Sequence, residues 1–135
     1  MFLIIPLATR AAVDRVAPDQ RALDAVFKQS GVQRRGLFVF SPEAGTDGAT
    51  VYSRMLGATF EDPATGSASG PLGSYLVKHG IVKPADAQTI VSAQGVKMGR
   101  PSRIHIRIDG TPEDITRVRV GGSSVLVGAG SLRAG

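Results

Sequence analysis

Short apolar, β-prone runs separated by turn residues dominate the hydrophobic pattern of this chain. Such runs predict buried strands, and here they cover residues 1–7, 36–41, 49–56 and 89–93. The segment 103–109 alternates strictly, with isoleucine at every second position between polar residues, which predicts a strand with one buried face. Residues 118–127 predict a hairpin that turns through two consecutive glycines, Gly121 and Gly122.

Three other segments show the hydrophobic spacing of a helix or the residues that typically begin and end one. Residues 9–16 predict a short helix capped by Thr9, and residues 18–30 predict a longer helix that ends before Gly31. The segment 68–78 is rich in Gly, Ala, Ser and Leu and poor in charge, so we expect it to be buried on most sides. The sequence therefore predicts an α+β fold, in which a curved, mostly antiparallel or mixed sheet wraps around a central helix.

Length and composition narrow the class of protein. A chain of 135 residues is expected to form a single domain, 1–135. It has no cysteine, and its histidines, His79 and His105, are too far apart in sequence to predict a metal site. No apolar run reaches the roughly 20 residues that span a bilayer, so a membrane is not an expected partner and a cytoplasmic location is expected.

The net charge of +5 raises the question of nucleic acid binding. The arginines are scattered, however, and aromatic residues make up only 5% of the chain, which leaves little for base stacking. We therefore expect no nucleic acid partner. An acidic metabolite is a simpler partner for a positive field.

The segment 61–72 brings a carboxylate, hydroxyl groups and small residues to the start of the central helix. Asp62 precedes a proline, which favours an extended or turn conformation, and Gly66 lets the backbone approach a ligand closely. Free amides at a helix start attract anions. The amides expected to receive a carboxylate are those of Gly66, Ser67 and Ala68. The alternative is that these polar residues only cap the helix, and a capping role is favoured for Thr65.

The run EDPATGSASGPLGSYLVKHG at 61–80 resembles the signature of the PhzF-like family of phenazine biosynthesis, which has the diaminopimelate-epimerase-like fold. Other stretches agree in order and spacing, namely FLIIPLATRAAVDRVAPD at 2–19, GLFVFS at 36–41, YSRM at 52–55, QGVKMGRPSRIHI at 94–106 and VRVGGSSVLVGAGSL at 118–132. The resemblance extends over nearly the whole chain but covers only the C-terminal half of the family's usual length. It implies one lobe of a two-lobed protein whose active site lies between the lobes.

Carried over to matching positions, the resemblance implies that Asp62 and Ser67 are catalytic and that Thr65, Gly66, Ser67 and Ala68 bind the substrate. It implies an isomerase or epimerase of a biosynthetic process, which moves a proton on a small carboxylate-bearing metabolite without metal or organic cofactor. The family's proton-carrying glutamate and a Gly-His pair belong to the other lobe, and this sequence shows no counterpart. A non-catalytic binding remnant and one half of a split enzyme therefore stay open as alternatives.

In the family each lobe borrows a C-terminal strand from the other. A single lobe would leave an unpaired sheet edge, so the resemblance implies a homodimer that exchanges C-terminal strands. His79 and His105 are expected at the surface. The turn 99–102 could bind an anion, but the favoured interpretation is a connection between strands that carries an exposed arginine.

Overall fold

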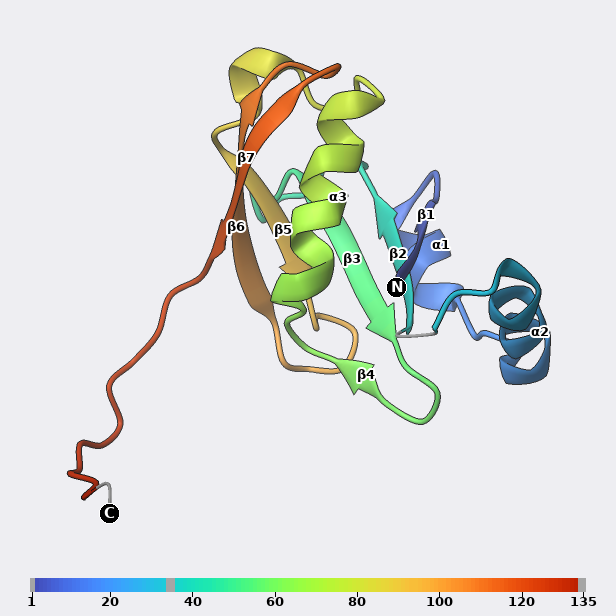
Figure 1. Ribbon diagram of the computed structural model, residues 1–135, viewed down its shortest axis with the longest axis horizontal. Helices are drawn as coiled ribbons and strands as arrows, with labels where there is room; N and C mark the ends of the chain where they lie inside the picture. Colours follow the sequence, from blue (N-terminus) through green and yellow to red (C-terminus); the bar gives the residue numbers. More distant parts are fainter. Residues whose placement is uncertain (1, 34–35, 134–135) are drawn as a thin grey trace.

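The computed structural model of the protein describes residues 2–33 and 36–133, so Met1 of the first predicted strand lies outside the described residues. One mixed sheet forms the centre of the molecule (Figure 1). Its strands are β1 (Phe2–Pro6), β2 (Gly36–Ser41), β3 (Val51–Leu56), β4 (Glu61–Asp62), β5 (Ile90–Gln94), β6 (Ser102–Gly110) and β7 (Ile115–Gly121). The helices are α1 (Arg10–Arg15), α2 (Gln20–Ser30), α3 (Gly66–Lys78) and the short 3₁₀ helix η1 (Pro84–Asp86).

The strands follow the order β1-β2-β3-β5-β6-β7, and the short β4 pairs with β3 beside that path. The pairs β1–β2 and β3–β5 are parallel, whereas β2–β3, β5–β6 and β6–β7 are antiparallel. Helix α3 lies in the crossover between the parallel strands β3 and β5 (Figure 1). The predicted α+β fold, with a curved mixed sheet around a central helix, is confirmed.

The sheet has two faces of different character. The inner face packs on α3 and forms the larger core, to which β2 contributes Phe38 and Phe40. The outer face of the same strand contributes Leu37 and Val39 to a second core beneath α1 and α2. Because β2 is buried on both faces, its sequence is apolar throughout rather than alternating.

Small residues bring α3 close to the sheet. A Cβ atom built on Gly73 would lie 2.5 Å from Ile106 Cγ2, so no larger residue fits without displacing β6. The isoleucines at 104, 106 and 108 are buried beneath the helix, while Arg103, His105 and Arg107 between them are exposed. The predicted alternation of this strand is therefore confirmed.

The predicted hairpin at 118–127 is wrong. Residues 115–121 form the single strand β7, which returns antiparallel along β6 after the turn at 111–114. From residue 122 to residue 133 the chain forms no strand and runs away from the sheet (Figure 1). Its apolar run is exposed, at 83% for Val125, 87% for Leu126 and 95% for Val127, because the described part of the chain offers this run no partner.

Other differences concern the ends of elements. Strand β3 begins at Val51 rather than at residue 49, and α3 begins at Gly66 rather than at residue 68. Thr9 caps α1 by accepting a hydrogen bond from the Ala12 amide, as predicted. Within residues 2–33 and 36–133, no helix has the length and apolar character needed to cross a membrane.

Candidate functional site

A buried glutamine fixes the loop that leads into α3. Gln94, at the end of β5, is fully buried. Its Nε2 donates to the Asp62 carbonyl oxygen at 2.7 Å and to Thr65 Oγ1 at 2.9 Å, and its Oε1 accepts from the Thr65 amide at 3.2 Å. Both ends of the loop 62–65 are thus held by one side chain, so the start of α3 has a defined position on the sheet.

The Asp62 carboxylate is bound within the same loop. It accepts the Thr65 hydroxyl at 2.8 Å and the Ala64 amide at 3.4 Å. Thr65 occupies the N-cap position of α3, as expected, but its hydroxyl makes no capping hydrogen bond. The capping expectation for Thr65 is therefore wrong at the level of the side chain, because its hydroxyl donates to Asp62 and accepts from Gln94 instead.

Glycine is required where the next turn approaches this loop. Gly95 has φ +74°, and a Cβ atom there would lie 2.9 Å from the Pro63 carbonyl oxygen. The left-handed conformation and the close approach both exclude larger residues. The turn after β5 can therefore pack directly against the loop before α3.

The first two residues of α3 are exposed to solvent. The Ala68 and Ser69 amides point to the Thr65 carbonyl oxygen at 3.3 and 3.1 Å, whereas the first amides of any helix have no acceptor within it. Those of α3 belong to Gly66 and Ser67, both exposed, and a Cβ atom built on Gly66 would meet no atom within 4 Å. Of the three amides expected to receive a carboxylate, these two are available, while Ala68 is buried and its amide is engaged.

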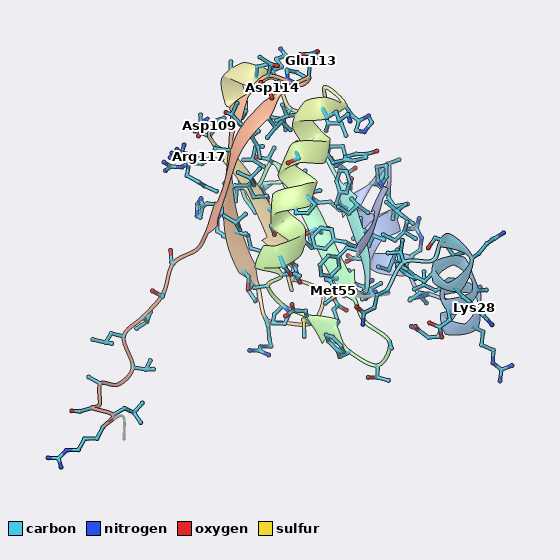
Figure 2. All side chains as sticks on the ribbon, in the orientation of Figure 1. Lys28, Met55, Asp109, Glu113, Asp114 and Arg117 are labelled. Atoms are coloured by element: carbon cyan, nitrogen blue, oxygen red, sulfur yellow. The ribbon has the colours of Figure 1, made fainter. Side chains whose placement is uncertain are left out.

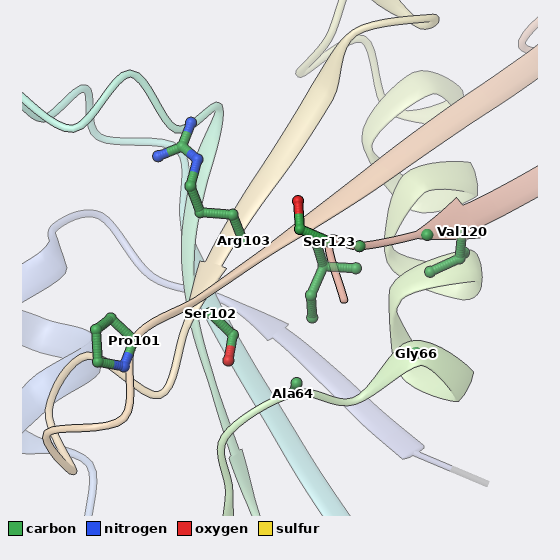
Figure 3. A pocket seen from close by; sticks show the side chains of 10 residues that line it. Ala64, Gly66, Pro101, Ser102, Arg103, Val120 and Ser123 are labelled. Carbon is green, nitrogen blue, oxygen red and sulfur yellow. The ribbon is translucent and has the colours of Figure 1, made fainter. Parts of the chain in front are cut away.

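A pocket of about 630 Å³ opens beside this helix start (Figure 3). It is lined by Ala64 and Gly66 on one side, by residues 101–104 of the turn and β6 on the other, and by residues 120–123. Ser102 stands opposite Gln94 in the β5–β6 ladder, and Figure 3 shows its hydroxyl directed toward the Ala64 loop. The Arg103 guanidinium turns away from that loop and donates to the Asp47 carbonyl oxygen at 2.7 Å.

The pocket lining differs from the predicted site in three ways. Of the predicted site residues only Gly66 lines the pocket, whereas Asp62, Thr65, Ser67 and Ala68 do not, and the lining contains no carboxylate and no histidine. Gly121 and Gly122 are lining residues that the sequence did not reveal, and Ser102 belongs to the turn 99–102, for which the anion-site interpretation was not favoured. The turn before Ser102 was the available signal, but its residues are also ordinary turn formers.

A buried ion pair holds the strand that carries Asp62. Arg54 donates to both carboxylate oxygens of Glu61 at 2.9 and 2.8 Å. Its Nη1 also donates to three carbonyl oxygens at the end of α1, those of Val13, Asp14 and Val16. The hydrogen bonds with Glu61 raise the pKa of Arg54. Both carboxylate oxygens of Glu61 are therefore engaged by Arg54 and are not free to act as a base.

The two histidines lie where the sequence placed them. His79 follows α3 and is exposed, with its ring 4.2 Å from that of Tyr75, and His105 lies on the exposed face of β6. Across the described residues, no three His, Cys, Asp or Glu side chains come together in a way that could hold a metal ion.

Comparison with known proteins shows the family to which the chain belongs. The profile described as phenazine biosynthesis-like protein (PhzC-PhzF) matches residues 1–130. This chain belongs to that family. The trans-2,3-dihydro-3-hydroxyanthranilate isomerase of Pseudomonas chlororaphis is 35% identical, over 96% of this chain and 44% of the relative. The uncharacterized isomerase YddE of Escherichia coli (strain K12) is 34% identical, over 93% of this chain and 42% of the relative.

Solved structures agree with this assignment. A putative phenazine biosynthesis PhzC/PhzF protein from Clostridium difficile (strain 630) superposes with a TM-score of 0.66 at 21% identity, over 98% of this chain and 45% of that protein. A predicted epimerase from Pseudomonas aeruginosa gives a TM-score of 0.63 at 27% identity, over 95% and 43%. The chain thus spans less than half the length of these PhzF-family relatives, whose curated members carry isomerase names.

Proposed function

We propose that this lobe holds the carboxylate of a small metabolite at the start of α3 while a proton is moved on that metabolite, in an isomerase or epimerase reaction that needs no cofactor. The observation that carries the proposal is the pocket of about 630 Å³ that opens at Gly66. Its volume lies within the range of about 300–1,000 Å³ that is typical of small-molecule sites. Gly66 lines this pocket and Ser67 follows it in the exposed first turn of α3, where helix amides provide positive potential for an anion.

In this proposal the residues of the loop have separate tasks. The amides of Gly66 and Ser67 bind the carboxylate, and the exposed Ser67 hydroxyl adds a donor beside them. Asp62 accepts two hydrogen bonds from its own loop, which leaves carboxylate lone pairs for a donor on the substrate. Asp62 would then position the substrate and its mobile proton.

One observation favours a second candidate. The lining of the pocket contains no group that ordinarily serves as a general acid or base. The lobe would then be a binding module, or one half of an enzyme whose proton carrier comes from another lobe or another chain. In both cases the carboxylate grip at α3 is the same.

A second copy of this chain is the proposed assembly partner. The exposed run Val125–Val127 leaves the sheet as an apolar arm, and β1 and β7 each lack a neighbour on one side in the described sheet. An arm exchanged between two copies would bury its apolar side chains and pair an open edge. Sedimentation should show a dimer that is lost when the chain is truncated after Ser123, and a monomeric full chain would contradict this.

The proposed activity is tested with a panel of small hydroxy- and amino-carboxylates in deuterated water. Binding with hydrogen exchange into the ligand, lost in Asp62→Asn, supports the isomerase. Binding without exchange supports the binding module. If no carboxylate of the panel binds, both candidates fail.

A matched pair of variants isolates the helix start. Gly66→Val should abolish carboxylate binding without lowering the unfolding midpoint, because the added side chain enters open space at the pocket. Lys78→Val, at the exposed far end of the same helix, should leave the affinity unchanged. Unchanged affinity in Gly66→Val would contradict the proposed grip.

A further inference from the structure

The outer face of the β6–β7 hairpin carries a row of basic side chains. Arg103, His105 and Arg107 alternate with the buried isoleucines of β6, so they point away from α3. Arg117 and Arg119 stand on the same face of β7, opposite Asp109 and Arg107 in the ladder. In the described part of the chain no helix covers this face. These arginines are spaced along the sequence and come together only in the folded sheet.

Two of these cations oppose each other directly. Arg107 and Arg119 are cross-strand partners, and like charges in this position destabilise a sheet. Arg119 is partly neutralised by Asp109, to whose oxygens it donates at 2.9 and 3.0 Å. Arg107 makes no ion pair or hydrogen bond with any side chain in the described residues, and the same holds for His105. An uncompensated cation thus stands beside a second one.

The surface is hollowed at this place. A pocket of about 390 Å³ is lined by His105, Arg107 and Arg119 and by residues 120–123, where the chain leaves the sheet. Residues 120–123 also line the pocket at Gly66, so the two pockets are neighbours along the end of β7. The basic pocket shares no residue of β6 with the pocket at Gly66, whose β6 residues are 102–104.

We propose that this hollow is a second ligand site, which binds a small molecule carrying two linked phosphate groups. A guanidinium presents a planar fork of donors that matches phosphate oxygens. Arg107 provides a whole fork, and beside it Arg119 provides the donors that remain while its Nη2 donates to Asp109. His105 adds a ring donor at the edge of the same pocket. A phosphate bound between the two guanidinium groups would offset the repulsion between Arg107 and Arg119.

The charge pattern favours a small ligand over a nucleic acid. The basic row ends at Asp109, and the hairpin turn beyond it carries Glu113 and Asp114, which Figure 2 shows at the far end of β6 and β7. A continuous phosphate backbone that followed the row would meet these carboxylates. Neither strand carries a Phe, Tyr or Trp ring on which bases could stack.

Calorimetric titration with pyrophosphate tests the proposal on the full chain. Pyrophosphate should bind more tightly than inorganic phosphate, and Arg107→Gln should weaken it about tenfold, the expected effect of losing one charge-assisted contact. Arg117→Gln removes the same charge from the same face outside the pocket and should change the affinity less than about twofold, since only diffuse attraction is lost.

Three outcomes would overturn the proposal. These are no detectable binding of pyrophosphate, equal weakening by Arg107→Gln and Arg117→Gln, and tighter binding of a duplex DNA than of pyrophosphate. Arg107→Lys, which keeps the charge but not the fork, should bind less tightly than the unchanged chain. Gly66→Val should leave pyrophosphate binding intact, so this site can fail or succeed independently of the proposed carboxylate grip.

Discussion

In both halves of the sheet every second side chain points to the outer face, but the outward side chains of the two halves differ in polarity. On β2 and β3 the outward side chains are mainly apolar and lie beneath α1 and α2. On β6 and β7 the outward side chains are mainly arginines and face solvent. The connections explain the difference, because α1 and α2 lie in the long segment between β1 and β2, whereas short turns join β5 to β6 and β6 to β7. The length of a connection thus decides which half of the sheet can be covered.

Arginine also occurs in the covered half, but in a different state. Arg54 is buried, and its donors reach two carboxylate oxygens and three carbonyl oxygens. Arg107 in the bare half has no such partners. The buried Arg54 thus stabilises the fold through acceptors on Glu61 and α1. The exposed Arg107 has no side-chain partner among the described residues, which is why the proposed ligand site is built on it.

The largest expected effect comes from Arg54→Met. The change leaves Glu61 without its partner and removes the donors at the end of α1, and breaking a buried pair in this way costs about 3 kcal/mol or more. The free energy of unfolding from urea titration measures it. A loss below about 1 kcal/mol would mean that the covered half does not depend on its buried cation, in the manner of a surface pair.

Tyr52→Phe tests a neutral donor in the same half. Tyr52 is buried, and its hydroxyl donates to Asp14 Oδ1 on α1 at 2.7 Å. A hydrogen bond to a charged group contributes about 1.5 kcal/mol, so the unfolding free energy should fall by roughly this amount. No change, with α1 still helical by circular dichroism, would show that packing alone attaches α1 to the sheet.

A pH series tests the ion pair that joins α1 to the loop before β3. Hydrogen bonds from Arg10 hold the pKa of Asp47 at about 2, below its ordinary value. Because the folded pKa is lowered, this contribution to stability is complete above about pH 4 and disappears as the pH falls toward 2. Asp47 is part-exposed, so Asp47→Asn should lose less than about 1 kcal/mol at pH 6, and the difference from the unchanged chain should vanish near pH 2. A difference that persists at pH 2 would assign the effect to something other than charge.

Arg107→Met should have the smallest effect on stability. The side chain is exposed and unpaired in the described structure, so the unfolding free energy should stay within about 0.5 kcal/mol of its original value. A slight gain is expected because the repulsion with Arg119 disappears. A loss as large as that of Arg54→Met would erase the distinction between the two halves.

Much of the fold could be predicted because local patterns determined it. The isoleucines of β6 show their buried face by alternation, and the small residues of α3 indicate close packing. The apolar run at 125–127 misled the prediction, because such a run shows that burial is favourable but not which surface provides it. It was assigned to a hairpin with β7, whereas β7 pairs with β6.

The site was predicted only in part. Gly66 was recognised from the helix-start signal, and the pocket does open there. Gln94 could not be recognised, since its role depends on a contact with a loop 29 residues away in the sequence. Ser102 lies in the turn 99–102, which was considered as an anion site and not favoured, because only its register with Gln94 brings it to the pocket. Long-range pairing, rather than local preference, decides both positions.

The hydrogen bonds from Gln94 to both ends of the loop 62–65 should affect the rate of ligand binding. A loop already fixed by folding loses little conformational entropy when a ligand arrives. Association should therefore proceed in one kinetic phase, at a rate proportional to ligand concentration. In Gln94→Ala the loop would first have to become ordered, and a slow, concentration-independent step should then limit binding.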